Sequence, residues 1–150
     1  MKEPKSILVT GGAGYIGSVL THKLVEIGYN VRIIDSLIYG KNGISDLISK
    51  NSVELIEKDI RDEKTLNKVV EDIDCVIHLA AIVGDLPCQA APKSTYQINF
   101  QGTQLLADLA RKKGVQRFVF TSTWAPYLPC EIYCLCISRA KLLTTDLLKT

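Results

Sequence analysis

Four glycines in one short stretch, Gly11, Gly12, Gly14 and Gly17, are the first residues of this sequence whose spacing suggests a chemistry. They directly follow the apolar run Ile7 to Val9, and an amphipathic helical pattern begins behind them. The start of a helix presents unpaired backbone N–H groups and the positive end of the helix dipole to an anion. Glycines in the preceding turn let a phosphate approach the main chain because no side chain blocks it. The stretch therefore predicts a site for the pyrophosphate of a dinucleotide.

A carboxylate stands where such a site needs one. Asp35 ends the next strand-like run, about twenty residues beyond the glycines. A carboxylate there accepts hydrogen bonds from both ribose hydroxyls of the adenosine and repels a 2'-phosphate, which favours NAD over NADP. The pattern leaves one alternative open, a flavodoxin-like domain in which the glycines form a turn and Asp35 caps the next loop.

The elements that must position these residues alternate along the chain. Short β-branched runs predict five strands, separated by segments of helical period. The strands are Ser6–Thr10, Asn30–Asp35, Val53–Lys58, Cys75–Leu79 and Arg117–Thr121. Right-handed crossovers arrange such strands in the order 3-2-1-4-5. We therefore predict an α/β fold, a doubly wound Rossmann-like parallel sheet, in a single domain over residues 1–150.

The helical segments carry their own start and stop signals. One is closed by Gly28, the next has Asp62 as its N-cap, and a long one from Lys93 to Lys113 is closed by Gly114. A last helical segment is predicted over Ser138 to Thr150. The apolar stripe of the first helix consists of Ile16, Val19, Leu20, Leu24 and Ile27. Such stripes indicate helices that pack on the sheet.

Composition limits the kinds of partner. The 150 residues include 18 basic and 16 acidic side chains, for a formal net charge of +2. The basic residues are scattered, which argues against nucleic acid and anionic membranes as partners. The N-terminal residues lead directly into a strand-like run, unlike a secretory signal, and no apolar stretch approaches the length of a membrane span. We therefore expect a cytoplasmic protein whose five cysteines are mostly reduced.

Five motifs, in order along the chain, resemble those of the extended short-chain dehydrogenase/reductase family, specifically its NAD-dependent sugar-nucleotide epimerases and dehydratases. The motifs are TGGAGYIGS at Thr10–Ser18, KDIRD at Lys58–Asp62, VIHLAA at Val76–Ala81, INFQGT at Ile98–Thr103 and RFVFTSTWAPY at Arg117–Tyr127. The resemblance implies hydride transfer between NAD and a sugar carbon of a nucleotide sugar. It also implies a homodimer as one arrangement, because family members commonly pair through two of the helices predicted above.

The resemblance assigns cofactor-side roles to particular residues. Asp59 and Ile60 would hold the adenine ring, and Asn99 would face the cofactor from its helix. The full set implied is Gly11, Gly14, Tyr15, Ile16, Gly17, Asp35, Ser36, Asp59, Ile60, Leu79, Ala80, Ala81, Val83, Asn99, Thr121 and Lys141. Two alternatives stay open: Asp59 as the start of the following helix and Asn99 as an exposed helix residue. We expect His78 to be packed or hydrogen-bonded rather than catalytic.

The resemblance also implies a catalytic hydroxyl, tyrosine and lysine. The tyrosine takes a proton as the hydride leaves, and the lysine four residues later lowers the pKa of that tyrosine. Thr123 and Lys141 match two of these positions, with a plain strand-end role as the alternative for Thr123. Ile137 occupies the tyrosine position and cannot carry a proton, and Tyr133 is the nearest phenol.

Two hypotheses follow for function. The chain is either an epimerase or dehydratase that works with a displaced Tyr133, or a truncated or degenerate NAD-binding module without turnover. The loop before Ile137 is shorter than in the family, and the family's C-terminal substrate-binding part is missing from the 150 residues. These features favour the second hypothesis.

Three cysteines raise the question of a metal. Cys130, Cys134 and Cys136 could supply thiolates to zinc, but their C-x-x-x-C-x-C spacing lacks a second close ligand pair. We therefore expect no metal, and apolar packing or reactive thiols instead.

Overall fold

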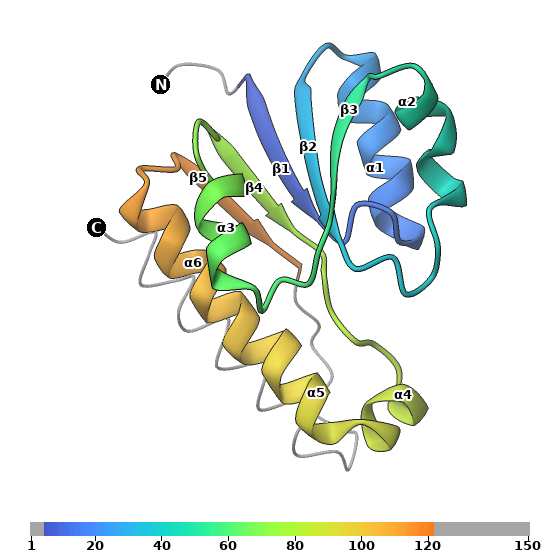
Figure 1. Cartoon of the computed structure of the whole chain (residues 1–150), viewed down its shortest axis with the longest axis vertical. Coiled ribbons are helices and arrows are strands. Elements are labelled where there is room, and N and C mark those ends of the chain that lie inside the picture. The colour runs from blue at the N-terminus through green and yellow to red at the C-terminus, as the bar shows by residue number, and fades with distance from the viewer. Residues whose placement is uncertain (1–4, 122–150) are drawn as a thin grey trace.

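The computed structural model describes residues 5–121 and arranges them as one twisted sheet between two layers of helices (Figure 1). The strands are β1 (Ser6–Thr10), β2 (Asn30–Asp35), β3 (Val53–Glu57), β4 (Cys75–His78) and β5 (Arg117–Phe120). They lie in the order β3-β2-β1-β4-β5 with every neighbouring pair parallel. The predicted order is confirmed, and three of the predicted strands end one residue early. A flavodoxin-like order of 2-1-3-4-5 is excluded.

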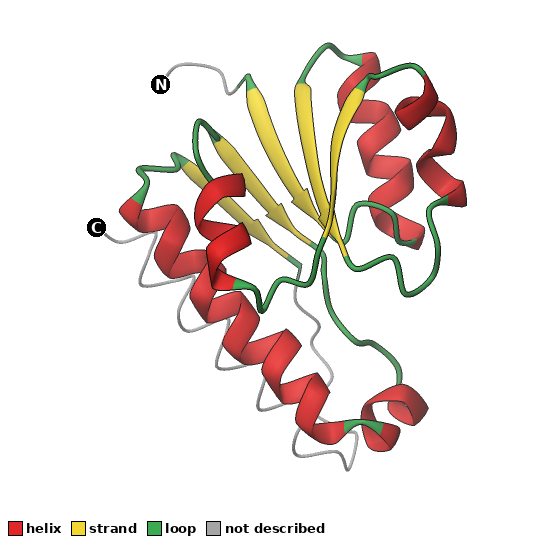
Figure 2. Cartoon of the chain, in the orientation of Figure 1, coloured by secondary structure: helices red, strands yellow, loops and turns green. Residues whose placement is uncertain are grey.

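The central strand explains why the apolar runs predict this sheet. Leu8 of β1 packs in one cluster with Ile34 and Val76, on the face covered by helices α3 (Glu63–Val69) and α6 (Thr103–Lys112). The side chains that alternate with Leu8 belong to a second cluster on the opposite face, covered by α1 (Tyr15–Glu26) and α2 (Ser45–Ser49) (Figure 2). A parallel strand that is buried on both faces reads as a continuous apolar run.

The long predicted helix is present, but its backbone changes type in the middle. The remaining helices are η1 (Asn42–Ile44), α4 (Asp85–Ala90), α5 (Pro92–Tyr96) and η2 (Gln97–Gly102). Residues 92–112 form one continuous helical run, in which the η2 segment is a π-helix between α5 and α6. A π-helix adds a residue to the turn, so the side chains after it face a different direction from those of an uninterrupted α-helix.

The predicted helix ends that lie in the structure are confirmed. Gly28 and Gly114 have φ angles of +92° and +75°, the left-handed conformation that closes helices. The Asp62 carboxylate accepts a hydrogen bond from the backbone N–H of Thr65 at the start of α3. The helix predicted over residues 138–150 lies outside the described residues. Within residues 5–121, no helix is long and apolar enough to cross a membrane.

The stripe predicted for the first helix coincides only in part with the face that packs on the sheet. Ile16, Val19 and Ile27 are 66%, 57% and 68% exposed. The buried residues of α1 are Gly17, Thr21 and Leu24, and Leu20 packs against the same cluster, so Leu20 and Leu24 are the part of the stripe that faces the sheet. A Cβ atom at Gly17 would collide with the carbonyl oxygen of Gly11, so the helix packs directly on the backbone of the preceding turn. This contact fixes the rotation of α1 and leaves Ile16, Val19 and Ile27 exposed.

Thr21 provides a test of this rotation. The helix buries its side chain completely, and its Oγ1 has no hydrogen-bond partner among the described residues. A buried hydroxyl without a partner costs about 1–3 kcal/mol. We expect Thr21→Val, which keeps the shape and removes the hydroxyl, to raise the free energy of unfolding by about 1 kcal/mol in urea denaturation.

The control for this prediction is Thr21→Ser, which keeps the hydroxyl and loses the methyl group. It should lower the free energy of unfolding, because it leaves a small cavity beside the same orphaned hydroxyl. A valine variant less stable than the wild type would mean that the Thr21 hydroxyl is paired, and the rotation of α1 described above would be wrong.

Candidate functional site

A cleft of about 990 Å³ lies at the carboxyl ends of the strands. Every predicted cofactor residue that the structure describes lines it: Gly11, Gly14, Tyr15, Ile16, Gly17, Asp35, Ser36, Asp59, Ile60, Leu79, Ala80, Ala81, Val83, Asn99 and Thr121. The volume suits a ligand at the large end of those that proteins bind in clefts. The structure thus brings these residues together, and their roles toward a cofactor remain predictions.

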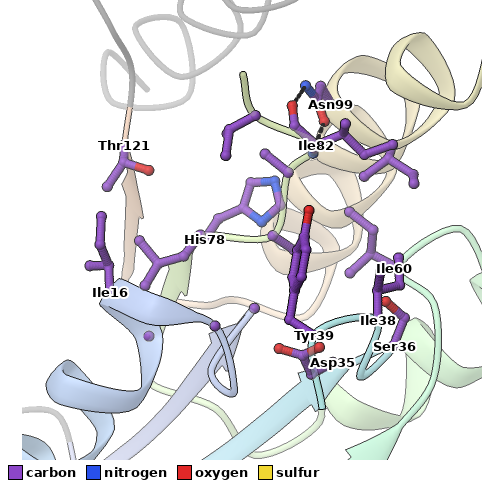
Figure 3. A pocket seen from close by; sticks show the side chains of 18 of the residues that line it. Ile16, Asp35, Ser36, Ile38, Tyr39, Ile60, His78, Ile82, Asn99 and Thr121 are labelled. Atoms are coloured by element: carbon purple, nitrogen blue, oxygen red, sulfur yellow. Dashed lines mark hydrogen bonds between the residues drawn. The ribbon is translucent and has the colours of Figure 1, made fainter. Parts of the chain in front are cut away.

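The cleft has two chemically different ends (Figure 3). Asp35 and Ser36 lie at one end, close to Ile60, whereas Ile16 and Thr121 lie at the other. Side chains that sequence analysis did not select complete the lining, among them Ile38, Tyr39, Lys58, His78, Ile82 and Phe120. The site therefore suits an extended ligand with a polar group at the Asp35 end.

The glycine turn forms a cradle with no room for side chains. Gly11 has a φ of +71°, and a Cβ atom there would lie 2.8 Å from the backbone nitrogen of Ala80. Gly14 is the N-cap of α1, and among residues 5–121 no side chain caps this helix end. The first N–H groups of α1 therefore face the cleft without a side-chain acceptor, as an anion-binding helix start requires.

The carboxylate of Asp35 is held in place by two loops. Its Oδ2 accepts a hydrogen bond from the backbone N–H of Ala13 at 3.0 Å, and its Oδ1 accepts one from Leu37 at 2.8 Å. Leu37 has a φ of 56°, an uncommon conformation for this residue type, and its bond to Asp35 helps to hold it. Each oxygen keeps a further lone pair for a ligand hydroxyl.

Asp59 is paired with Arg61 rather than placed at a helix start. The guanidinium donates to both carboxylate oxygens, from Nε at 2.9 Å and from Nη2 at 2.7 Å. These hydrogen bonds lower the pKa of Asp59. The N-cap of α3 is Asp62, so the alternative in which Asp59 begins that helix is wrong.

Asn99 is buried, so its alternative as an exposed helix residue is also wrong. Its Oδ1 accepts from the backbone N–H of Ile82 and its Nδ2 donates to the carbonyl of the same residue, both at 2.8 Å (Figure 3). Three residues later, a Cβ at Gly102 would lie 2.9 Å from Cδ1 of Ile60, so this glycine lets the helix approach the Ile60 side chain closely. The π-helical segment thus holds the wall at Ile82 by hydrogen bonds and packs closely on the wall at Ile60.

His78 is hydrogen-bonded inside the protein, as predicted. It is 1% exposed, its Nδ1 lies 2.6 Å from Oγ1 of Thr10, and its Nε2 lies 2.7 Å from Oγ1 of Thr103. Burial lowers the pKa of His78 to about 4, so the ring is neutral near pH 7. Sequence analysis missed both threonines. Two signals were present: both threonines stand in the quoted motifs, Thr10 at the start of TGGAGYIGS and Thr103 at the end of INFQGT, and Thr103 is four residues after Asn99 on one helix.

The predicted catalytic residues Thr123, Tyr133 and Lys141 lie outside the described residues, as do Ile137 and the three cysteines considered for a metal site. The structure therefore describes the predicted cofactor side of the site and ends at Thr121, which lines the cleft.

Comparison with known families gives a match over most of the chain. The sequence model described as the NAD dependent epimerase/dehydratase family matches residues 7–133. Among curated proteins, a UDP-glucose 4-epimerase from Klebsiella pneumoniae is 36% identical over 126 residues, which cover 81% of this chain and 91% of that protein. The chain spans only 32–39% of the length of six other curated relatives.

Solved structures agree with this match. A UDP-N-acetylglucosamine 4-epimerase from Methanobrevibacter ruminantium superposes with a TM-score of 0.84 at 27% identity, covering 99% of this chain and 52% of that one. A UDP-glucose-4-epimerase from Stenotrophomonas maltophila, solved with bound NAD and formylated UDP-arabinopyranose, gives a TM-score of 0.81 at 28% identity, covering 95% and 48%. The chain thus spans about half the length of these structures.

Proposed function

We infer that this chain, which belongs to the NAD dependent epimerase/dehydratase family, binds NAD in its cleft. We propose that the cleft serves hydride transfer at a sugar carbon of a nucleotide sugar. The observation that carries the proposal is the glycine cradle, in which a Cβ at Gly11 or Gly17 would meet backbone atoms. A turn so close to a helix start leaves room for a phosphate at the N–H groups of α1.

The residues of the cleft fit NAD in their chemistry. The cradle before α1 would hold the pyrophosphate, and the Asp35 carboxylate would accept hydrogen bonds from the adenosine ribose. Asp59 and Ile60 would hold the adenine, with Arg61 orienting the Asp59 carboxylate. When bound, NAD would supply the hydride acceptor for oxidation of a sugar hydroxyl.

The catalytic roles are proposed from the family resemblance. Thr123 would donate a hydrogen bond to the reacting oxygen, and Lys141 would bind the nicotinamide ribose. Tyr133 would take the hydroxyl proton, because the family's tyrosine position is occupied by Ile137. Binding of NAD without turnover is the second candidate function, because the residue four positions before Lys141 is an isoleucine. A homodimer remains a proposal from the resemblance, and a cytoplasmic location remains a proposal from the composition of the sequence.

Titration calorimetry of the purified chain with NADH and NADPH tests the proposal. We expect saturable binding of NADH, with NADPH bound at least about tenfold more weakly because its 2'-phosphate meets the Asp35 carboxylate. A folded sample that binds neither nucleotide would overturn the proposal. Incubation with NAD and UDP-glucose, followed by separation of the sugar nucleotides, then distinguishes the two candidates. A new epimer supports the enzyme, and binding without any product supports the second candidate.

A further inference from the structure

We propose that His78 is a positioning residue of the cofactor cleft. Its neutral imidazole, with the proton on Nε2, completes a closed network of hydrogen bonds that holds the backbone of Ala80 and Ile82 in place. The inference rests on the proposed function in so far as the cleft is taken as a cofactor site. The hydrogen-bond network itself does not depend on a cofactor, because it is formed by residues of β1, β4, η2 and α6.

On the helix side, the network runs from the imidazole to the cleft wall. Nε2 of His78 lies 2.7 Å from Oγ1 of Thr103, and the Thr103 hydroxyl donates to the carbonyl of Asn99 at 2.8 Å. The side chain of Asn99 in turn makes both of its hydrogen bonds to the backbone of Ile82. Two residues, Thr103 and Asn99, therefore join the imidazole to the wall.

On the strand side, the network returns to the same wall. Nδ1 of His78 lies 2.6 Å from Oγ1 of Thr10, the last residue of β1. The backbone N–H of Ala80 donates to the same hydroxyl at 3.2 Å. The segment between Ala80 and Ile82 is thus held at both ends, from β1 and from the helix.

The number of hydrogens decides the tautomer. A threonine hydroxyl carries one hydrogen, and Thr103 donates its hydrogen to Asn99. The contact between His78 and Thr103 therefore requires an N–H on Nε2. In a neutral ring Nδ1 is then an acceptor, and it takes the hydrogen of Thr10, whose oxygen accepts from Ala80. With this tautomer, each donor of the hydrogen-bond network donates to one acceptor.

The surroundings of His78 keep it neutral. Thr10 packs against it from β1, Thr103 from α6, and the rings of Phe118 and Phe120 from β5, at centroid distances of 6.2 and 5.6 Å. None of these groups is charged. Burial alone accounts for its lowered pKa. A protonated ring would carry N–H groups on both nitrogens and would leave the hydroxyl of Thr10 without its acceptor.

The hydrogen-bond network matters for the cleft because of where it holds Ala80. The backbone nitrogen of Ala80 would be only 2.8 Å from a Cβ atom on Gly11, so the loop packs directly on the glycine cradle. A displacement of Ala80 would move atoms against that cradle. His78 thus acts on the cofactor site through Ala80 and Ile82, although its ring is buried.

The tautomer is measured directly by long-range ¹H–¹⁵N spectra of the imidazoles. The chain has one other histidine, His22, which is partly exposed and hydrogen-bonded to Asp46. A His22→Gln variant leaves only the signals of His78. We expect a proton on Nε2, unchanged between about pH 8 and pH 5. A proton on Nδ1, or a charged ring at pH 7, would overturn the proposal.

Variants of Thr103 test the positioning role. We expect Thr103→Val to weaken NADH binding by about tenfold and Thr103→Ser, which keeps the hydroxyl, by no more than about twofold. Thr21→Val is the matched control, a buried threonine outside the network, and should bind NADH like the wild type. Equal affinities of Thr103→Val and wild type would refute the role, as would an equal loss in Thr21→Val.

Amide hydrogen exchange separates this inference from the proposed function. In the chain without nucleotide, the amides of Ala80 and Ile82 should exchange slowly, and at least about tenfold faster in Thr103→Val. If the wild type binds no NADH, the proposed function fails. The difference in amide exchange rates between the wild type and Thr103→Val still shows whether the hydrogen-bond network positions this wall. Equal exchange in the two proteins would overturn the inference even if NADH binds.

Discussion

Replacement of Gly17 by alanine is expected to weaken NADH binding by about a hundredfold, which corresponds to roughly 2.7 kcal/mol. A Cβ atom at this position would collide with the carbonyl oxygen of Gly11 and lie 2.8 Å from the Cα of Gly12. These are backbone atoms of the cradle and cannot rotate away as a side chain could. The start of α1 must therefore move, together with the N–H groups that face the cleft.

The same substitution should lower stability, although alanine favours helices. Alanine in place of glycine inside a helix gains about 1 kcal/mol of intrinsic propensity. Forcing an extra carbon into a packed contact costs about 1–3 kcal/mol. Because the contact at Gly17 involves rigid backbone, we expect the second effect to exceed the first. Urea denaturation should show a net loss of about 1 kcal/mol in the free energy of unfolding.

A second glycine separates stability from binding. Gly28 has a φ of +92°, and a Cβ atom added there would meet no atom of the described residues within 4 Å. Gly28→Ala therefore strains the backbone at a residue that does not line the cleft. It should lower stability by about 1 kcal/mol and leave NADH affinity unchanged. If Gly17→Ala binds NADH as well as Gly28→Ala does, the turn is not the phosphate cradle that we propose.

The sequence predicts the sheet well because the physical signals for it are local. In the strand Ser6–Thr10 the middle residues, Ile7 to Val9, are buried on both faces and are therefore all apolar, and β-branched residues fit such positions. The glycines mark a turn that few other residues can adopt, and Gly28 and Asp62 mark helix ends by their own conformation or hydrogen bond. These elements required no knowledge of distant contacts.

The exposure of half of the α1 stripe and the interior of the site could not be predicted in this way. The apolar pattern of the helix includes the buried Leu24 and the exposed Ile16 alike, and the backbone contact of Gly17 decides which part of it faces the sheet. The π-helical segment shifts the phase of the helix that carries Asn99 and Thr103, and periodicity does not reveal such a shift. The Thr10 hydroxyl is hydrogen-bonded to His78 on another strand, and this contact exists only in the folded chain.

Replacement of Asp35 by asparagine is the second substitution with a large expected effect. Its two carboxylate oxygens accept backbone N–H groups of Ala13 and Leu37, so both positions need an acceptor. An asparagine has only one oxygen and would direct its NH₂ group toward one of these donors. We expect the loop at Leu37, whose φ is 56°, to lose this support. NADH binding should weaken by about thirtyfold through the lost hydrogen bonds to the loop and the ribose.

The effect of Asp35→Asn on NADPH distinguishes charge from shape. The substitution removes the negative charge that would face the 2'-phosphate, so NADPH affinity should fall much less than NADH affinity, and the preference for NADH should narrow by at least about fivefold. Glu57→Gln makes the same charge change beside Asp35 in the sheet register, at an exposed residue that does not line the cleft. It should alter neither affinity. Equal losses of NADH and NADPH binding in Asp35→Asn would mean that Asp35 supports the loop without selecting the cofactor, because a carboxylate that faces the ribose must discriminate between them.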